Sequence, residues 1–136
     1  MINKADIIIS LEWLSLPTDK YYLGLGGSMV MQDIKTNTRD LDISVSHELF
    51  NELSCTYDTT IAPMGGSMIS LLGGLITIFP EDIIPSKIEY LDSYPIETLS
   101  SIRNWKQIRG RMKDLMDVKL IDLYLERRRS HEIKSN

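Results

Sequence analysis

The sequence predicts one α/β (α+β) domain in which a mixed β-sheet of about four to six strands is flanked by helices. Short apolar segments with alternating or β-branched residues occupy residues 21–25, 40–46 and 56–79, whereas the end of the chain has helical periodicity. The 136 residues, 43% of them hydrophobic, suffice for one ordinary core. We therefore expect a single domain over residues 1–129 and a flexible C-terminal tail over residues 130–136.

The predicted elements follow a definite order. They are a helix over 4–16, a strand over 21–25, a turn at Gly26-Gly27-Ser28, a helical turn over 29–34, a strand over 40–46, a helix over 47–53, two or three strands within 56–79, a short strand over 87–91 and a helical region from Pro95 that divides at Gly110.

Local signals define the elements of the first half. Pro17 ends the first helix in a turn. Leu41 and Ile43 share one face of the strand over 40–46, because side chains alternate with period two. Ser46 is expected to cap the next helix, since its hydroxyl can accept a first-turn N–H group.

Glycine and proline define the second half. β-Branched residues and two glycine pairs within 56–79 predict strands joined by tight turns. Gly-Gly-Ser-Met occurs twice, and we interpret the second copy, at 65–68, as a hairpin turn. Pro95 fits the first position of a helix. Residues 114–129 carry a wide apolar stripe, typical of a helix that packs on a core.

Composition excludes several classes of protein. No apolar run approaches the roughly 20 residues needed to cross a bilayer, so we expect no membrane segment. The single cysteine, Cys55, cannot form an internal disulfide, which favours a cytoplasmic protein. A net charge of −4 argues against broad non-specific binding of nucleic acid. Two histidines and one cysteine provide no credible zinc ligand set.

Two aspartates, Asp40 and Asp42, stand one residue apart in a predicted strand, where aspartate is depleted. The period of two places both carboxylates on one face, about 7 Å apart along the backbone. Mg²⁺ suits such a pair, because it binds one or two carboxylates together with waters and substrate phosphates. A solvent-facing strand that merely alternates polar and apolar residues explains the pair equally well.

Upstream, Gly26, Gly27 and Ser28 follow an apolar strand. Glycine lets the backbone approach a ligand closely and supplies positive φ. Backbone amides at such a turn, with the N-terminus of the following helix, suit phosphate oxygens. Ser28 adds a hydroxyl donor. An ordinary tight turn is the alternative interpretation.

The combination of these motifs resembles the signature of the DNA polymerase beta-like nucleotidyltransferase superfamily. The matching residues are Leu25-Gly26-Gly27-Ser28 and Thr38-Arg39-Asp40-Leu41-Asp42-Ile43. Residues 111–117, Arg-Met-Lys-Asp-Leu-Met-Asp, are similar to a segment of some minimal bacterial members, which include relatives of the nucleotidyltransferase toxins of abortive-infection systems. Asp114 can equally be a helix N-cap, with Asp117 in a position like that of a capping box.

The resemblance implies a nucleotidyltransferase fold with a nucleotide–metal site. It implies that Asp40 and Asp42 are catalytic and hold one or two Mg²⁺ ions. The residues it implies for binding a nucleoside triphosphate such as ATP are Gly26, Gly27, Ser28, Arg39 and Lys113. Family members transfer a nucleoside monophosphate to an acceptor and release pyrophosphate. The expected acceptor is a small molecule, a protein or an RNA, and a second subunit or a partner protein is expected to help bind it.

One part of the family pattern is missing. Catalytic members usually carry a third carboxylate on a later strand, and the corresponding position here is Thr77. Glu81, Asp82 and Glu89 are nearby alternatives. The sequence therefore leaves open whether the protein is an enzyme. The alternative is a non-catalytic nucleotidyltransferase-fold binding module, for example a toxin–antitoxin or phage-defence component.

Overall fold

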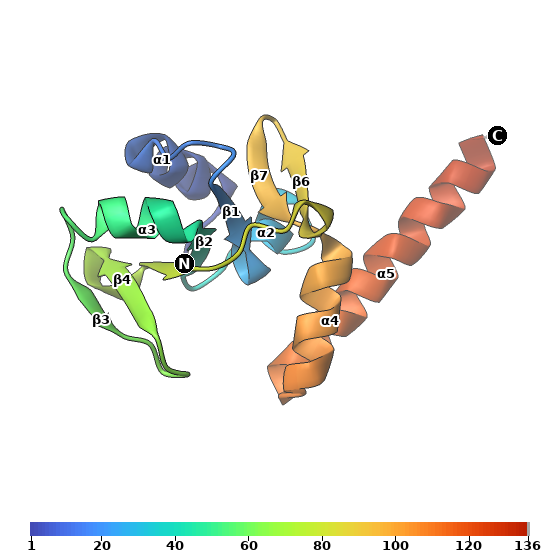
Figure 1. The fold of residues 1–136 in the computed structure, drawn as a ribbon. Helices are drawn as coiled ribbons and strands as arrows, with labels where there is room; N and C mark the ends of the chain where they lie inside the picture. Colours follow the sequence, from blue (N-terminus) through green and yellow to red (C-terminus); the bar gives the residue numbers. More distant parts are fainter. Residues whose placement is uncertain (136) are drawn as a thin grey trace. The chain divides into compact units, whose positions relative to one another are not determined.

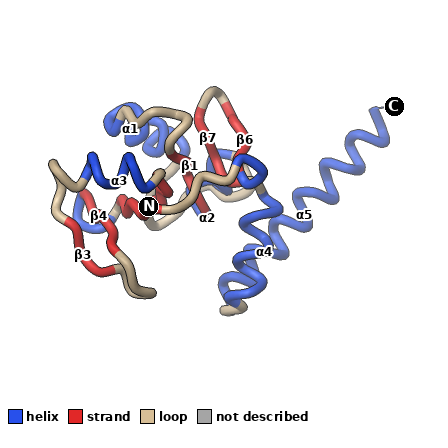
Figure 2. Tube along the Cα trace, in the orientation of Figure 1, coloured by secondary structure: helices blue, strands red, loops and turns tan. Residues whose placement is uncertain are grey.

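The computed structural model describes the backbone of residues 1–135 and the side chains of residues 1–132. The chain divides into two compact units, Met1–Thr98 and Leu99–Asn136. This boundary falls inside the region that the sequence predicted as one domain. The first unit contains all strands of the described chain, and the second consists of two helices (Figure 2).

The elements of the first unit are drawn in Figure 1. They are α1 (Lys4–Leu14), β1 (Tyr21–Gly24), α2 (Leu25–Met31), β2 (Leu41–Val45), α3 (His47–Leu53), β3 (Thr59–Ile61), β4 (Ser67–Leu71), β5 (Ile76–Pro80), β6 (Ile88–Leu91) and β7 (Tyr94–Glu97), with short 3-10 turns at Leu72–Gly74 and Pro85–Lys87.

The strands form one mixed sheet, as predicted, in the order β3-β4-β5-β2-β1-β7-β6. At its centre, β2 runs antiparallel to β1 and parallel to β5, and β1 runs parallel to β7. The sheet has seven strands, whereas the sequence predicted four to six. The prediction fell short because β7 was interpreted as part of a helix.

The prediction of a helix from Pro95 is wrong. Pro95 lies in β7, and α4 begins only at Leu99. Asp92 and Ser93 have positive φ values of 50° and 71° and form the tight turn that joins β6 to β7. Pro95 stands near the start of its strand, where a missing backbone N–H costs little.

Most other local predictions are confirmed. The first helix forms as α1, with a capping box between Asn3 and Asp6. Ser46 caps α3, since its Oγ accepts the N–H of Leu49 at 3.1 Å. The second Gly-Gly-Ser-Met lies at the turn of the β3–β4 hairpin, where Gly65 and Gly66 both have positive φ.

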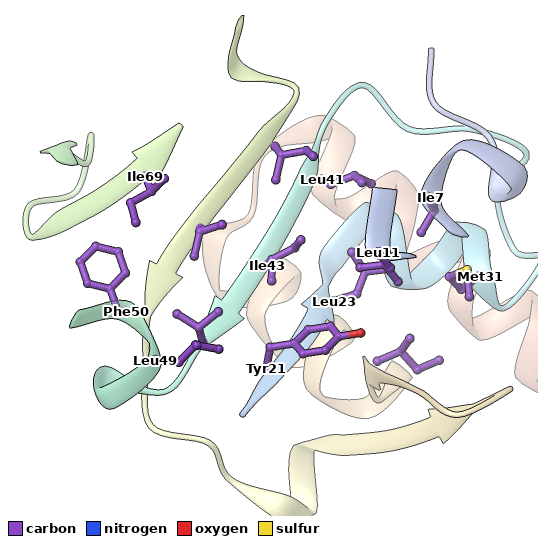
Figure 3. Close-up of a cluster of buried hydrophobic side chains, with 14 of the residues drawn as sticks. Ile7, Leu11, Tyr21, Leu23, Met31, Leu41, Ile43, Leu49, Phe50 and Ile69 are labelled. Atoms are coloured by element: carbon purple, nitrogen blue, oxygen red, sulfur yellow. The ribbon is translucent and has the colours of Figure 1, made fainter. Parts of the chain in front are cut away.

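The hydrophobic core of the first unit lies on one face of the sheet. Alternate strand residues point to this face, where α1, α2 and α3 contribute apolar side chains (Figure 3). The core residues drawn with labels are Ile7, Leu11, Tyr21, Leu23, Met31, Leu41, Ile43, Leu49, Phe50 and Ile69. The strand residues between them therefore point to the opposite face, which carries most of the polar side chains of the central strands.

The second unit contains α4 (Leu99–Arg109) and α5 (Met112–Ser135), which separate at Gly110 as predicted. Gly110 has φ 68°, in the left-handed region that glycine tolerates. The helix α5 continues through Ser135, where the sequence predicted a tail over 130–136, and an Arg128–Glu132 pair four residues apart supports this end. Asn136 lies outside the described residues. No described helix is long and apolar enough to cross a membrane.

Truncation of Ile43 tests the position of the core. Ile43 is 0% exposed in the central strand β2, whereas Ile61 is 84% exposed in β3. We expect Ile43→Ala to lower the free energy of unfolding by about 3 kcal/mol, because it removes buried methyl groups and leaves a cavity. Ile61→Ala should change it by less than about 0.5 kcal/mol. Urea unfolding of both variants measures the difference, and equal effects would contradict the described core.

Candidate functional site

The Gly-Gly-Ser motif lies within the first turn of α2, whereas the sequence predicted a turn ahead of a helix. β1 ends at Gly24, and α2 begins at Leu25. The glycines were also expected to supply positive φ, but that role falls to Leu25, which has φ 46°. Gly24 keeps the extended backbone of the strand, and the chain changes direction at the next residue, Leu25.

Gly26 and Gly27 are required by packing. A Cβ on Gly26 would lie 2.6 Å from Oγ1 of Thr38, and a Cβ on Gly27 would lie 2.8 Å from Cδ1 of Leu23. Both distances are too short for a real carbon contact. The absence of side chains therefore lets α2 lie directly against β1 and against the segment that leads to Asp40.

The two aspartates lie beside this turn. Asp42 is half-buried in β2, in register with Gly24 of β1. Asp40 is exposed one residue before β2 begins, because the regular strand starts at Leu41 and not at residue 40 as predicted. Arg39, next to Asp40, is exposed as well. The Gly-Gly-Ser and Asp-x-Asp motifs are separated in the sequence. The pairing of β1 with β2 brings them together in the structure.

Thr77 is the residue of β5 that pairs in register with Asp42. Paired residues of neighbouring strands point to the same face, so a threonine lies next to Asp42 at the position where the sequence resemblance led us to expect a third acid. Glu89 pairs with Ile96, whose side chain is part of the core, and therefore points to the opposite face from Asp42. This position excludes Glu89 as a replacement for the third acid.

Glu81 and Asp82 lie beyond the end of β5 and line a cavity of about 310 Å³. Glu81 accepts a hydrogen bond from the hydroxyl of Tyr22 at 2.7 Å, and Asp82 lies 3.2 Å from Nε2 of His47. Burial raises the pKa of Tyr22 well above its usual value, so the hydroxyl keeps its proton. Since Tyr22 precedes Gly24 by two residues in β1, the cavity adjoins the sheet face that carries Asp42.

Glu97, the last residue of β7, lies beside the two motifs and was not identified by the sequence analysis. Its side chain is on the same face as Asp42 and only 7% exposed, and its Oε1 accepts the N–H of Leu25 at 3.0 Å. The analysis missed it because Pro95 was taken as a helix start, which placed Glu97 in a first helical turn. The signal that could have found it is the Asp-Ser pair at 92–93 between two short apolar segments.

Ser28 is fully buried and has a structural contact in the described conformation. Its hydroxyl donates to the backbone carbonyl of Glu97 at 2.7 Å, and the side chain of Gln32 donates to Ser28 Oγ at 3.1 Å. A hydroxyl has one proton to donate. A phosphate oxygen can therefore receive that proton only after the hydroxyl turns away from the carbonyl.

The Arg-x-Lys-Asp-x-x-Asp segment forms a buried ion-pair network within the second unit. Asp114, 1% exposed at the third position of α5, accepts the backbone N–H of Arg111 at 3.3 Å and its Nε at 2.7 Å. Lys106 of α4 lies 2.9 Å from Asp117 and 3.7 Å from Asp114. Asp114 thus takes the N3 role of a capping box, and not the N-cap position itself. Lys113 is exposed on α5.

The donor set of the first unit fits Mg²⁺ and no softer metal. Among the residues with described side chains, no group of three histidine, cysteine or acidic residues is close enough to hold a metal ion. Mg²⁺ needs fewer protein ligands, because one or two carboxylates suffice when substrate phosphates complete its shell. Asp40 and Asp42 offer such hard oxygen ligands, and the neighbouring Gly24 presents no side chain beside Asp42.

The fold defined by these elements is that of the nucleotidyltransferases. A similar solved structure is the crystal structure of ANT(2")-Ia, an aminoglycoside nucleotidyltransferase, in complex with adenylyl-2"-tobramycin. The comparison has a TM-score of 0.59 and covers 95% of this chain and 91% of that chain, with 11% sequence identity. No protein-family model and no curated protein matches the sequence. The predicted fold is thereby confirmed.

The Asp114 network predicts a defined response to acid. The Arg111 hydrogen bonds lower the pKa of Asp114 to about 2 from its ordinary value of 3.8. Because the folded-state pKa is the lower one, the charged carboxylate stabilises the protein fully above about pH 4, and this contribution is lost as pH falls towards 2. We expect Asp114→Asn to cost about 3 kcal/mol at pH 7 and to flatten this part of the stability profile.

Asp122→Asn is the matched control, since it breaks the exposed Arg103–Asp122 pair between the same two helices. It should cost less than about 1 kcal/mol. Urea unfolding followed by circular dichroism between pH 2 and 7 measures both variants. Equal losses for Asp114→Asn and Asp122→Asn would contradict the buried network.

Proposed function

We propose that the protein binds a nucleoside triphosphate together with Mg²⁺ at the junction of β1, α2 and β2, as the step before transfer of a nucleoside monophosphate to an acceptor hydroxyl. The observation that carries this proposal is the juxtaposition of the two motifs. Asp42 is in register with Gly24, and Gly26 packs against Thr38, two residues before Asp40. The Asp-x-Asp carboxylates therefore lie next to the glycine-rich start of α2.

The proposed roles follow from the chemistry of these groups. Asp40 and Asp42 would hold the metal ion, which would neutralise the phosphates and orient them for in-line attack. Backbone N–H groups of a first helical turn have no acceptor within the helix. Those at Gly26, Gly27 and Ser28 are therefore the proposed donors to phosphate oxygens. The close packing of both glycines keeps this backbone fixed, so little ordering is needed on binding.

Two cations are proposed to bind the triphosphate. Arg39 precedes Asp40 directly, and a guanidinium there can pair with a phosphate oxygen. Lys113 belongs to the second unit and matches the lysine of the segment shared with minimal bacterial members. We assign it the same kind of contact, with the outer phosphates.

The acceptor is a small molecule, a protein or an RNA. The cavity beside Tyr22 is its proposed position, because it adjoins the face that carries Asp42. The tobramycin in the similar structure is a small-molecule acceptor of that other protein. A second subunit or a partner protein is proposed to contribute to the acceptor site.

A non-catalytic binding module is the second candidate function, and Thr77 is the observation that favours it. Without a carboxylate on β5, Asp42 has no acidic neighbour on that side. A cytoplasmic toxin–antitoxin or phage-defence component that binds nucleotide without transferring it fits this feature. Incorporation of labelled nucleotide into an acceptor separates the two functions, because the binding module retains nucleotide affinity but incorporates none.

Removal of both aspartate charges tests the metal site. We expect calorimetry to show Mg²⁺-dependent binding of at least one nucleoside triphosphate, and we expect the double variant Asp40→Asn, Asp42→Asn to weaken it by at least about 100-fold, or roughly 3 kcal/mol. Asp33→Asn is the control, since Asp33 is an exposed aspartate paired with Lys4. Tight, metal-dependent binding that survives the double substitution would refute the site.

Lys113→Ala tests the proposed role of this lysine. If Lys113 contacts the outer phosphates, the variant should bind the triphosphate about tenfold more weakly and bind the monophosphate as the wild type does. Lys119→Ala, another exposed lysine of α5, should leave both affinities unchanged. Equal titration curves for the two variants with the triphosphate would remove Lys113 from the site.

A further inference from the structure

Four residues of neighbouring central strands stand level with one another on the polar face of the sheet. Thr77 of β5 pairs with Asp42 of β2, and Asp42 pairs with Gly24 of β1. On the other side of β1, the pairing of Leu23 with Ile96 places Glu97 of β7 beside Gly24. Asp42 therefore has a threonine on one flank and, beyond a glycine, a glutamate on the other.

The side chain of Glu97 reaches across the glycine towards β2. Its Oε1 lies 3.2 Å from the position that a Cβ on Gly24 would occupy, and the backbone carbonyl oxygen of Asp42 lies 3.6 Å from the same point. Neighbouring strands are about 4.8 Å apart. A carboxylate above β1 is thus about one strand spacing from the backbone of Asp42, within reach of that residue's side chain.

The Leu25 N–H orients the carboxylate of Glu97. Oε1 accepts the N–H of Leu25 at 3.0 Å, and the side chain is 93% buried, since only 7% is exposed. The bond to Leu25 also places this oxygen at the start of the proposed phosphate-binding turn.

We propose that Glu97 is the third carboxylate of the nucleotide–metal site and approaches it from β7, the opposite flank to the Thr77 position. This inference rests on the proposed function. The oxygen ligands of one Mg²⁺ lie about 3–4 Å apart, given bonds of about 2.1 Å. In the described conformation no three acidic side chains lie close enough to hold one ion, so Asp42 and Glu97 would meet on it by side-chain rotation over Gly24, which has no side chain. β7 is separated from β2 by β1, whereas β5 is directly adjacent to β2. A carboxylate on β7 therefore needs the longer side chain of glutamate, and aspartate would suffice on β5.

The test is a Mn²⁺ titration read by electron paramagnetic resonance, with Mn²⁺ in place of Mg²⁺. The protein is saturated with a non-hydrolysable analogue of the nucleoside triphosphate that binds the wild type most tightly. We expect Glu97→Gln to weaken Mn²⁺ binding by at least tenfold. Glutamine keeps the shape of the side chain and the oxygen that accepts the Leu25 N–H, so the melting temperature should stay within a few degrees of the wild type.

A rescue variant separates a metal ligand from a merely structural residue. Adding Thr77→Asp to Glu97→Gln places a carboxylate on the other flank of Asp42, and we expect it to restore most of the lost Mn²⁺ affinity. A structural defect in α2 would not respond to a charge on β5. Glu89→Gln, on the opposite face of the sheet, is the control and should bind Mn²⁺ as the wild type does.

The possible failures are distinguishable. Wild-type Mn²⁺ affinity in Glu97→Gln overturns the assignment of Glu97 alone, and so does an affinity that Thr77→Asp does not restore. Absence of metal-dependent nucleotide binding by the wild-type protein overturns the proposed function, and the assignment of Glu97 with it.

Discussion

The site depends on one constraint, the close approach of the β1–α2 connection to β2. Gly24 pairs with Asp42, and Gly26 and Gly27 let the first turn of α2 lie against Thr38 and Leu23. The contacts of Gly26 and Gly27 require the absence of a side chain. The two glycines of the Gly-Gly-Ser motif therefore allow the close packing of α2 against β1 and Thr38. A methyl group at Gly26 would lie 2.6 Å from Thr38 Oγ1, so either Thr38 or the first turn of α2 would have to move. The proposed binding of phosphate by the backbone N–H groups of this turn depends on the same packing.

The two faces of the sheet carry different kinds of side chain: one is apolar and packed against helices, and the other is largely polar. One face is filled by strand residues such as Leu23, Ile43 and Ile78 under α1, α2 and α3, and it supplies the stability of the first unit. The other presents Asp42, Glu97 and the cavity beside Tyr22. Because successive residues of a strand alternate between the faces, each central strand contributes to both. Substitutions at adjacent positions of one strand should therefore separate stability from binding.

Local signals in the sequence were sufficient for much of the fold and for part of the candidate site. The alternation around Asp42, the Ser46 cap and the hairpin at Gly65-Gly66 each depend on neighbours within a few residues. What failed depends on partners far along the chain. Pro95 fits a helix start by itself, and only pairing with β1 and β6 makes it part of a strand. Glu97 was missed for the same reason. The roles of Asp40, Arg39 and Lys113 stay predictions.

The hydrogen bond from Ser28 to the carbonyl of Glu97 joins the start of α2 to the end of β7. Glu97 is followed by Thr98, and the helical unit starts at the next residue, Leu99. A ligand that draws the Ser28 hydroxyl to itself breaks a contact two residues before that boundary. Loss of this contact would loosen the end of β7, so faster hydrogen exchange at Thr98 and Leu99 would indicate that Ser28 has bound the proposed ligand.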